Sequence, residues 1–319
     1  MNLIRRKSEK YLFYEALERR LGNMSTIKNT LQEALRKEGG GYAGELRVDR
    51  EIEESDFFKS YILMKGLIVG NSTSYAQIDT FIIHEKFVLI IEVKNLPGII
   101  KLDNQLHQIT RQRENGPVEG MRNPEDQLLR SERFVRKFLS FHNIPMPVHG
   151  LIVFSNPSSV LEKPFSKKSA IHVSGLHQTL ESLHLMYADH LYPKFEPRKI
   201  QLLFTQHEFE LNPYKPSHIL SKVNTEILQG VLCPQCINKV LIYRNKFWRC
   251  SQCHYKNAEE HRQALKEYRS LFSHKVTTKE WMKFSGIRSV STASRMLQKS
   301  NLFTDGTFKN RTYVIPRDL

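Results

Sequence analysis

The stretch AQIDTFIIHEKFVLIIEVKN, residues 76–95, constrains the fold more than any other part of the chain. Two apolar segments surround the short polar group at residues 84–86, a pattern typical of two β-strands joined by a turn. The sequence therefore predicts a buried hairpin. Such a hairpin has little room for charge, yet Asp79 lies near one outer end, and Glu92 and Lys94 lie near the other.

Glu92 and Lys94 are two residues apart, so their side chains share one face of a strand while Val93 points to the other. If the register places Asp79 directly opposite Glu92, the two carboxylates share that face, whereas a slip of one residue would separate them. Directly opposed carboxylates repel each other unless a cation lies between them. We expect them to bind Mg²⁺ or Mn²⁺, with the backbone carbonyl of Val93 as a further ligand.

Lys94 can orient an attacking water or stabilise charge on a phosphate, so the set suits metal-assisted hydrolysis of a phosphodiester bond. The structural alternative is a strand whose solvated ends happen to be charged. Beyond the charges, three segments resemble the nuclease-related domain, NERD, of the PD-(D/E)xK nuclease superfamily. These are GELRVDREIEE at 44–54, IDTFIIHEKFVLIIEVKN at 78–95 and NPEDQLLR at 123–130.

This resemblance covers roughly residues 40–155 and implies an α/β, restriction-endonuclease-like core with a mixed sheet flanked by helices. It also implies site residues. Glu45 matches an acid on the first helix that assists metal binding, and Asp79 matches the central metal-binding aspartate. Glu92 and Lys94 match the ExK pair. Gln127 matches a helix glutamine that lines the same site, although by itself it suits an ordinary polar position at a helix start.

Two positions depart from the family pattern. Thr80 stands where many members have a histidine after the aspartate, and an aromatic residue common after the ExK segment is absent. Neither departure removes a metal ligand, but both leave the subfamily open.

The rest of the core alternates strands with one strong helix. We expect strands at residues 60–70 and 148–156, the second apolar on both faces as a central strand is. The amphipathic segment 123–144 predicts a helix with Asn123 as its cap and Pro124 in its first turn. Residues 1–38 predict an N-terminal helical segment, GGGYAG at 39–44 is expected to end its second helix, and a third short helix carries Glu45. The domain is expected to span residues 39–215, with the proline-rich residues 193–216 as a connecting segment.

Two CxxC pairs, Cys233 with Cys236 and Cys250 with Cys253, predict a zinc ribbon at residues 229–260. Four thiolates close a tetrahedral shell, so the Zn²⁺ is expected to be structural, and the alternative is a redox pair. His254 is redundant as a ligand. Aromatic residues between basic ones, at positions 247, 248 and 255, suit either base stacking or the core of the ribbon.

Residues 262–319 contain 12 Lys and Arg against 4 Asp and Glu. Two helices, at 277–287 with Thr278 as cap and at 289–303, precede a strand pair at 305–316 joined at residues 309 and 310. This order resembles a winged helix-turn-helix. The second helix is expected to expose hydroxyl and basic side chains to DNA, with Arg311 on the wing. The nucleic-acid-binding residues expected are Ser291, Thr292, Arg295 and Arg311, with Ser289 and Ser294 beside them. The alternative is a protein-interaction module.

The whole chain of 319 residues carries 48 Lys and Arg against 33 Asp and Glu, a net charge of +15. Polyanions are natural partners of such a surface, nucleic acid first and an acidic membrane second. No apolar run reaches the length of a membrane span and no secretion signal is recognised. We therefore expect a cytoplasmic protein that does not act at a membrane. The resulting prediction is a deoxyribonuclease positioned by the two small units. A non-catalytic DNA-binding protein with a nuclease-like scaffold and an RNA-acting nuclease remain open, as does the oligomeric state.

Overall fold

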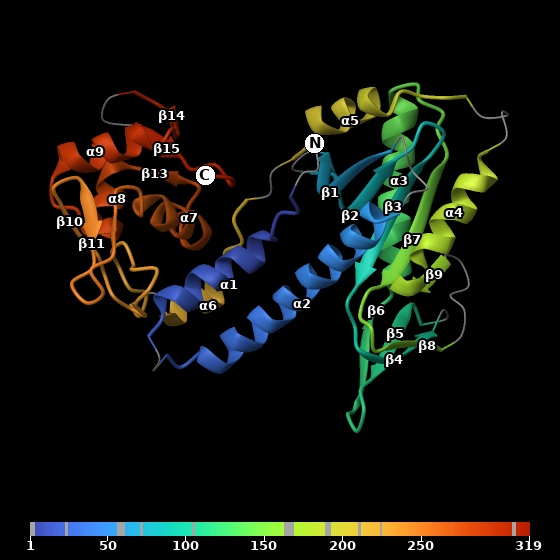
Figure 1. Cartoon of the computed structure of the whole chain (residues 1–319), viewed down its shortest axis with the longest axis horizontal. Coiled ribbons are helices and arrows are strands. Elements are labelled where there is room, and N and C mark those ends of the chain that lie inside the picture. Colours follow the sequence, from blue (N-terminus) through green and yellow to red (C-terminus); the bar gives the residue numbers. More distant parts are fainter. Residues whose placement is uncertain are drawn as a thin grey trace. The chain divides into compact units, whose positions relative to one another are not determined.

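The computed structural model describes residues 4–22, 25–55, 61–70, 73–103, 106–162, 169–188, 193–209, 212–223, 225–307 and 311–319. The described chain divides into two compact units (Figure 1). The first unit holds residues 4–6 and 39–209, and the second holds residues 7–38 and 212–319.

A five-stranded mixed sheet forms the centre of the first unit. Its order is β1-β2-β3-β7-β9. The pairs β1–β2 and β2–β3 are antiparallel, and the pairs β3–β7 and β7–β9 are parallel. The strands are β1 (Ile62–Gly70), β2 (Tyr75–Ile83), β3 (Val88–Lys94), β7 (Val148–Phe154) and β9 (Ser169–His172). The expected strands at 60–70 and 148–156 and the expected hairpin are confirmed, and β7 is central as its apolar faces predicted.

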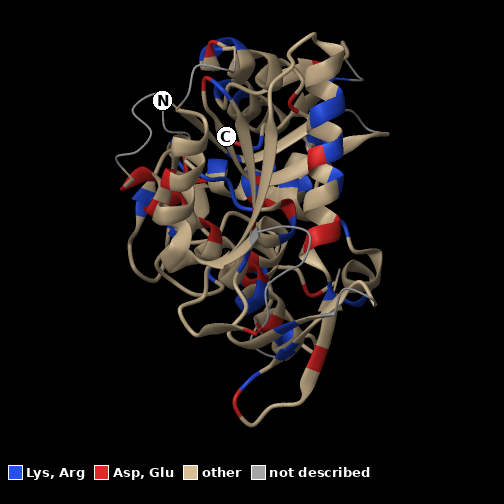
Figure 2. Cartoon of the chain, turned by 90° about the vertical axis from the view of Figure 1, so that its right-hand side faces the viewer, with Lys and Arg blue, Asp and Glu red and all other residues tan. Residues whose placement is uncertain are grey.

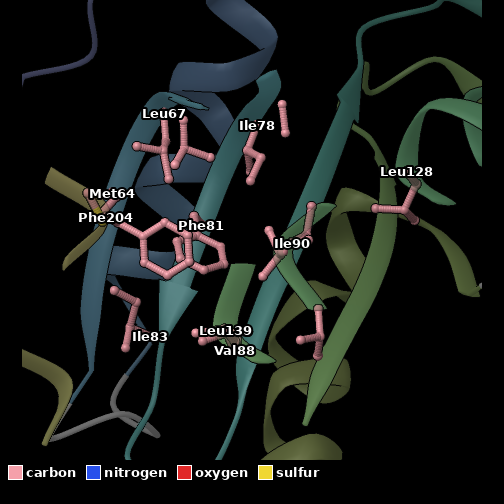
Figure 3. Close-up of a cluster of buried hydrophobic side chains, with 14 of the residues drawn as sticks. Met64, Leu67, Ile78, Phe81, Ile83, Val88, Ile90, Leu128, Leu139 and Phe204 are labelled. Atoms are coloured by element: carbon pink, nitrogen blue, oxygen red, sulfur yellow. The ribbon is translucent and has the colours of Figure 1, made fainter. Parts of the chain in front are cut away.

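Helices cover both faces of this sheet (Figure 1). One buried cluster joins the sheet to α3 (Pro124–Phe141) and α5 (Pro197–Gln206). Figure 3 shows part of this cluster, in which Phe81 of β2 meets Phe204 of α5. A second cluster joins the other face to the later turns of α2 (Lys28–Glu53) and to α4 (Leu176–Met186), which follows the short 3-10 helix Val173–Gly175. The mixed α/β architecture expected from the resemblance is confirmed.

A smaller four-stranded sheet, of order β6-β5-β4-β8, follows directly after β3 in the chain. Its strands are β4 (Gly98–Asp103), β5 (Gln108–Gln112), β6 (Val118–Arg122) and β8 (Ser159–Glu162). Ile100 and Ile109 belong to the same buried cluster as α3. The smaller sheet is therefore part of the body of the first unit.

The start of α3 follows the capping pattern that the sequence predicts. The Asn123 side chain accepts a hydrogen bond from the backbone N–H of Glu125, and Pro124 occupies the first turn. The cap satisfies an N–H group that would otherwise have no partner in the first turn. This fixes where α3 begins, and with it the position of Gln127.

The expected break at GGGYAG is wrong, because α2 runs through it without interruption to Glu53. A Cβ atom on Gly44 would lie 2.5 Å from the Ser155 hydroxyl oxygen and 2.6 Å from the Asn95 Cβ atom. The glycine is required by close packing of the helix against the ends of β3 and β7, and it does not mark a helix end. Glu45 therefore lies on a long helix instead of a short third one.

Residues 193–216 are not only a connecting segment, since they contain α5. Pro197 stands at the first position of that helix, where its missing N–H costs nothing and its fixed φ suits the helix. Ile200 and Phe204 of α5 are buried in the core. Of the prolines that predict a linker here, Pro197 begins a helix that packs on the sheet.

The second unit consists of short helices and two small sheets (Figure 1). In addition to the first turns of α2, its helices are α1 (Glu9–Arg20), α6 (Ser217–Val223), α7 (His261–Leu271), α8 (Thr278–Ser285) and α9 (Val290–Lys299). One sheet contains β10 (Ile242–Arg244), β11 (Phe247–Arg249) and β12 (Lys256–Asn257). The other contains β13 (Lys275–Val276), β14 (Phe303–Asp305) and β15 (Thr312–Val314).

One buried cluster runs through the cysteine-bearing segment and the C-terminal helices of this unit. It includes Trp248 of β11, Leu265 of α7, Trp281 of α8 and Leu297 of α9. Segments that the sequence presents as two successive small units therefore share a single core.

The helix α8 has its cap one residue earlier than expected. Thr277 and not Thr278 caps it, in a reciprocal capping box with Glu280, and Gly286 ends it at a φ of 77°. The helix α9 begins after Ser289, ends at Lys299 and buries Leu297. The strands β14 and β15 pair in antiparallel fashion, whereas the expected turn at 309 and 310 lies outside the described residues.

Within the described part of the chain, no helix combines the length and the hydropathy that crossing a membrane requires. Figure 2 shows the side of the first unit, where Lys and Arg are interspersed with Asp and Glu.

Candidate functional site

The hairpin register brings the two predicted metal-binding carboxylates together. Thr80 pairs with Ile91 in the ladder between β2 and β3, and extending this register by one residue places Asp79 opposite Glu92. The Asp79 carboxylate accepts a hydrogen bond of 2.9 Å from the backbone N–H of Val93. This bond holds Asp79 at the strand position next to Glu92.

The strand β2 is irregular at Asp79. Its partner position in β1 is Gly66, which has a φ of 65° and interrupts the ladder between the pairs on either side. Ile78 and Phe81 are three residues apart, yet both lie in the cluster that α3 covers, so the alternation of side chains breaks between them. Because Gly66 has no Cβ atom, β1 can adopt this positive φ between two regular stretches of the β1–β2 ladder.

Lys94 lies between a carboxylate and the helix α3. Its Nζ atom donates to Glu92 Oε1 at 2.5 Å and to Gln127 Oε1 at 3.5 Å. Glu92 is buried, while Lys94 and Gln127 are partly exposed. The structure thus brings together Asp79, Glu92, Lys94 and Gln127, all four on one end of the central sheet.

Glu45 reaches the same region from α2 through an arginine that the sequence did not predict. The buried guanidinium of Arg5 donates to Glu45 Oε2 at 2.8 Å and to the backbone carbonyl of Asp79 at 2.7 Å. It also forms two hydrogen bonds with Asp49, of 2.6 and 2.7 Å, and one of 2.7 Å with the Thr80 hydroxyl. Thr80 therefore binds a cation of the chain itself.

One signal for this contact was present in the sequence. Glu45 and Asp49 are four residues apart, so they lie on one face of a helix, where like charges are unfavourable without a cation between them. Nothing in the spacing of MNLIRRKSEK indicates that Arg5 supplies that cation, because the contact joins residues far apart in the chain.

The three carboxyl groups of the site hold protons more tightly than free carboxyls do. Loss of hydration and the nearby charge of Asp79 raise the pKa of Glu92 to about 8, although Lys94 opposes the shift. The same two causes raise the pKa of Glu45 to about 7, against the effect of Arg5. Burial also raises the pKa of Asp79, opposed by its bond from Val93. A divalent cation stabilises such buried carboxylates in their deprotonated form, because the cation takes the place of the protons.

The carboxylates do not form a closed three-ligand set. Among the described residues, the four cysteines are the one group of three or more His, Cys, Asp and Glu whose ligand atoms all lie within 4.8 Å of one another. Arg5 holds Glu45, and Lys94 holds Glu92. The donor set of Asp79 and Glu92 still fits a hard cation, since Mg²⁺ takes one or two carboxylates and keeps several waters.

The four predicted cysteines converge in the second unit. The sulfur atoms of Cys233 and Cys253 are 3.6 Å apart, and those of Cys250 and Cys236 are 3.9 Å apart. Zinc–sulfur bonds of about 2.3 Å in a tetrahedron require sulfur–sulfur distances of about 3.8 Å. The cluster fits a zinc ribbon and could bind zinc.

The hairpin between the two cysteine pairs has a tight turn at Asn245 and Lys246, with φ values of 52° and 65°. Of its aromatic residues, Trp248 is buried in the core and Tyr255 donates to Glu260 at 2.6 Å. These two serve the core and edge of the ribbon, although Tyr255, like Phe247, stays partly exposed beside basic side chains.

The predicted nucleic-acid-binding residues lie on α9 and at the start of β15. Ser291 and Arg295 are exposed, and the Arg295 Nε atom donates to the Ser291 carbonyl at 3.2 Å. Thr292 is partly buried, and Arg311 is exposed one residue before β15. Ser289 is exposed but caps α9, while Ser294 is half-buried.

Comparison with protein families gives one result for this chain. Residues 40–155 match the family model of NERD, the nuclease-related domain. The matched segment contains Glu45, Asp79, Glu92, Lys94 and Gln127. Searches of curated proteins and of solved structures give no match. Residues 40–155 of this chain are a nuclease-related domain.

Proposed function

We propose that the protein is a metal-dependent nuclease that hydrolyses phosphodiester bonds in DNA. The observation that carries the proposal is the pairing of Asp79 and Glu92, two carboxyls with raised pKa values, beside the ammonium group of Lys94. Carboxylates of this kind are suited to a divalent cation, and a neighbouring lysine suits a phosphate. The match to the nuclease-related domain supports the same reaction class.

Each residue of the site has a role in this proposal. Asp79 and Glu92 hold Mg²⁺ or Mn²⁺, with the Val93 carbonyl as a further ligand, and Glu45 assists from α2. The ion, when bound, acts as a Lewis acid toward the phosphate and lowers the pKa of a bound water. Glu92 must release Lys94 to bind the ion, which leaves the Lys94 ammonium free to contact the scissile phosphate. Gln127, within reach of Lys94, positions that ammonium.

The second unit has a binding role in the proposal. Cys233, Cys236, Cys250 and Cys253 hold a structural Zn²⁺, which leaves no open coordination position for catalysis. The helices α8 and α9 with β14 and β15 act as a winged helix that contacts DNA. Its contacts come from Ser291, Thr292, Arg295 and Arg311. Four reduced thiols in one cluster suit a cytoplasmic location.

One observation favours the alternative, a non-catalytic DNA-binding protein with a nuclease-like scaffold. Glu45 and Glu92 each already form an ion pair with a cation of the chain itself, Arg5 and Lys94. In this alternative, the two glutamates serve only to form these ion pairs inside the protein and do not bind a metal ion. The two functions differ in whether Mg²⁺ displaces Lys94 from Glu92.

The test is a cleavage assay on purified protein with Mg²⁺ or Mn²⁺. The substrates are linear and circular, single- and double-stranded DNA, and RNA. The proposal expects cleavage of at least one DNA that stops on chelation and is lost in Lys94→Ala. Binding of DNA without cleavage of any substrate would support the scaffold alternative, and cleavage of RNA alone would change the substrate class.

A further inference from the structure

A groove lies between the ribbon and the last helices of the second unit. It encloses about 600 Å³ and takes residues from the β10–β11 hairpin, from the start of α7 and from α9. The residues that carry its chemistry are Tyr243, Lys246, Phe247, Arg262, Arg295 and Lys299.

The two walls of the groove are fixed to each other. Trp248 on one side and Leu297 on the other lie in the same buried cluster. His261 of α7 also lies 3.2 Å from the Ser300 hydroxyl at the end of α9, ring nitrogen to oxygen. The groove is therefore a built feature of one body and does not depend on a flexible linker between two modules.

The groove is strongly positive. Its four cations, Lys246, Arg262, Arg295 and Lys299, face a single acid, Glu259. No ion pair between these four cations and a carboxylate is found within the described part of the chain. Cations gathered in this way, without acids of their own, are suited to the phosphates of a polyanion.

The size and the aromatic lining indicate which polyanion fits. A volume of about 600 Å³ lies in the range of sites that enclose a small ligand, of roughly 300–1,000 Å³, and is too small for a duplex. Phe247 and Tyr243 both line the groove, and the Lys256 ammonium lies over one face of the Phe247 ring, 4.0 Å from its centroid. Aromatic rings between cations are the usual platform for unpaired bases.

We infer that this groove binds one strand of unpaired DNA, with phosphates on its four cations and a base on Phe247. The ribbon and α9 thus act as one site for a single strand, in addition to any duplex contacts of Ser291 and Arg311 on the outer surface. The inference rests on the proposed function only in taking nucleic acid as the partner. It does not require the first unit to cleave.

The test measures binding of fluorescein-labelled 20-nucleotide single strands and of the matching duplex by fluorescence anisotropy. Binding is measured with full-length Glu92→Gln protein, in which cleavage of the DNA is expected to be lost. Unsubstituted protein without added divalent ions provides a second condition in which the DNA stays uncleaved. The groove variant is Lys246→Gln with Lys299→Gln. Its matched control is Lys279→Gln with Lys283→Gln, two exposed lysines of α8 that lie outside the groove.

The groove variant is expected to bind the single strand about tenfold more weakly or worse, with a salt slope smaller by about 1.4 for two lost phosphate contacts. Its duplex affinity and the control are expected to change less than about twofold. Phe247→Leu keeps apolar bulk but loses the aromatic face. It is expected to weaken single-strand binding roughly fivefold or more without changing the salt slope.

Equal losses in the groove variant and the control would overturn the inference, because a general positive surface would then explain binding. Equal losses for single strand and duplex would overturn it as well, as would tighter binding of an RNA strand of the same sequence. Cleavage by the unsubstituted protein is assayed in parallel. Normal cleavage with no groove effect would reject the groove alone, and a groove effect without cleavage would reject the nuclease proposal alone.

Discussion

Arg5 and Glu45 form an ion pair of 2.8 Å between the N-terminal segment and the helix α2. The same guanidinium donates to the backbone carbonyl of Asp79 and to both carboxylate oxygens of Asp49. One buried side chain thus connects the helix that carries one acid of the site to the strand that carries another. This makes the position of Glu45 relative to Asp79 depend on Arg5.

Arg5→Gln is expected to lower the free energy of unfolding by about 3–5 kcal/mol. The substitution removes the nearest cation of the buried Asp49 carboxylate and leaves it only the Lys65 ammonium, 3.8 Å away. Breaking a buried pair from one side is costly. Urea denaturation at neutral pH, followed by circular dichroism, measures the change.

The neighbouring arginine provides the control. Arg6 is about half exposed and lies 3.6 Å from Glu208, so Arg6→Gln is expected to cost less than about 1 kcal/mol. If the two substitutions cost the same, Arg5 is not the central contact that its geometry indicates.

The hairpin and the helix α3 were predictable because local rules determine them. Alternating and continuous apolar runs define strands, and Asn123 followed by Pro124 defines a helix start. The strict two-residue period of a strand then placed Glu92 and Lys94 on one face, and the observed register brings Asp79 opposite Glu92. Four cysteines in two matched pairs defined the ribbon in the same way.

The misplaced elements share another cause. The local sequence predicts a helix end at Gly44 and a linker at Pro197, although tertiary packing gives each residue a different role. Likewise, the contacts of Arg5 join residues 40 or more positions apart, which no local pattern encodes. Distant packing is the part of the structure that propensity and spacing leave undetermined.

In protein with its carboxylate site free of divalent ions, stability is expected to fall as the pH rises from about 4.5 to about 8. The raised pKa values of Glu92 and Glu45 mean that the folded state keeps protons that the unfolded state releases in this window. Their contribution is complete below the ordinary carboxyl pKa and is lost as the pH passes the folded values.

Mg²⁺ is expected to reverse this loss, because the cation binds the deprotonated carboxylates. The gain in melting temperature on adding Mg²⁺ should therefore be larger at pH 8 than at pH 6, measured by thermal scans in buffers without chelators so that zinc is retained. Glu92→Gln removes one raised pKa and should show both a flatter pH profile and a smaller gain. A gain of equal size at both pH values would contradict the shared cation.

Lys94→Ala and Asp79→Asn are expected to separate catalysis from metal binding. Both should reduce cleavage, Lys94→Ala by about 10²- to 10³-fold if the ammonium stabilises charge on the phosphate. Only Asp79→Asn should weaken Mg²⁺ binding. Lys94→Ala should strengthen it, because the ammonium that occupies Glu92 at 2.5 Å is gone.

The dependence of cleavage rate on Mg²⁺ concentration distinguishes these effects. Lys101→Ala is the control, since Lys101 is exposed on β4 and pairs with Glu162. A Lys94→Ala variant that cleaves at the normal rate, or that needs much more Mg²⁺, would show that Lys94 does not have the assigned role.

The cysteine cluster is expected to bind one zinc ion per chain. Four thiols with sulfur atoms 3.6 and 3.9 Å apart in pairs are crowded, and contacts between them raise the pKa of Cys236 to about 12. A bound cation is what allows all four to be thiolates at neutral pH.

Mass spectrometry of the metal content should therefore give one zinc for the unsubstituted chain and none for Cys250→Ser. His254→Ala should keep its zinc, since His254 is adjacent to Cys253 but the four cysteines already supply four ligands. Cys233 and Cys250 lie in the same buried cluster as Trp281 and Leu297, so zinc loss should destabilise the C-terminal helices as well as the ribbon. We expect the second unit to lose about 4 kcal/mol or more of its unfolding free energy, seen as early loss of the fluorescence change of Trp248 and Trp281. Intact tryptophan signals in a zinc-free Cys250→Ser variant would mean that the shared core is stable without the metal.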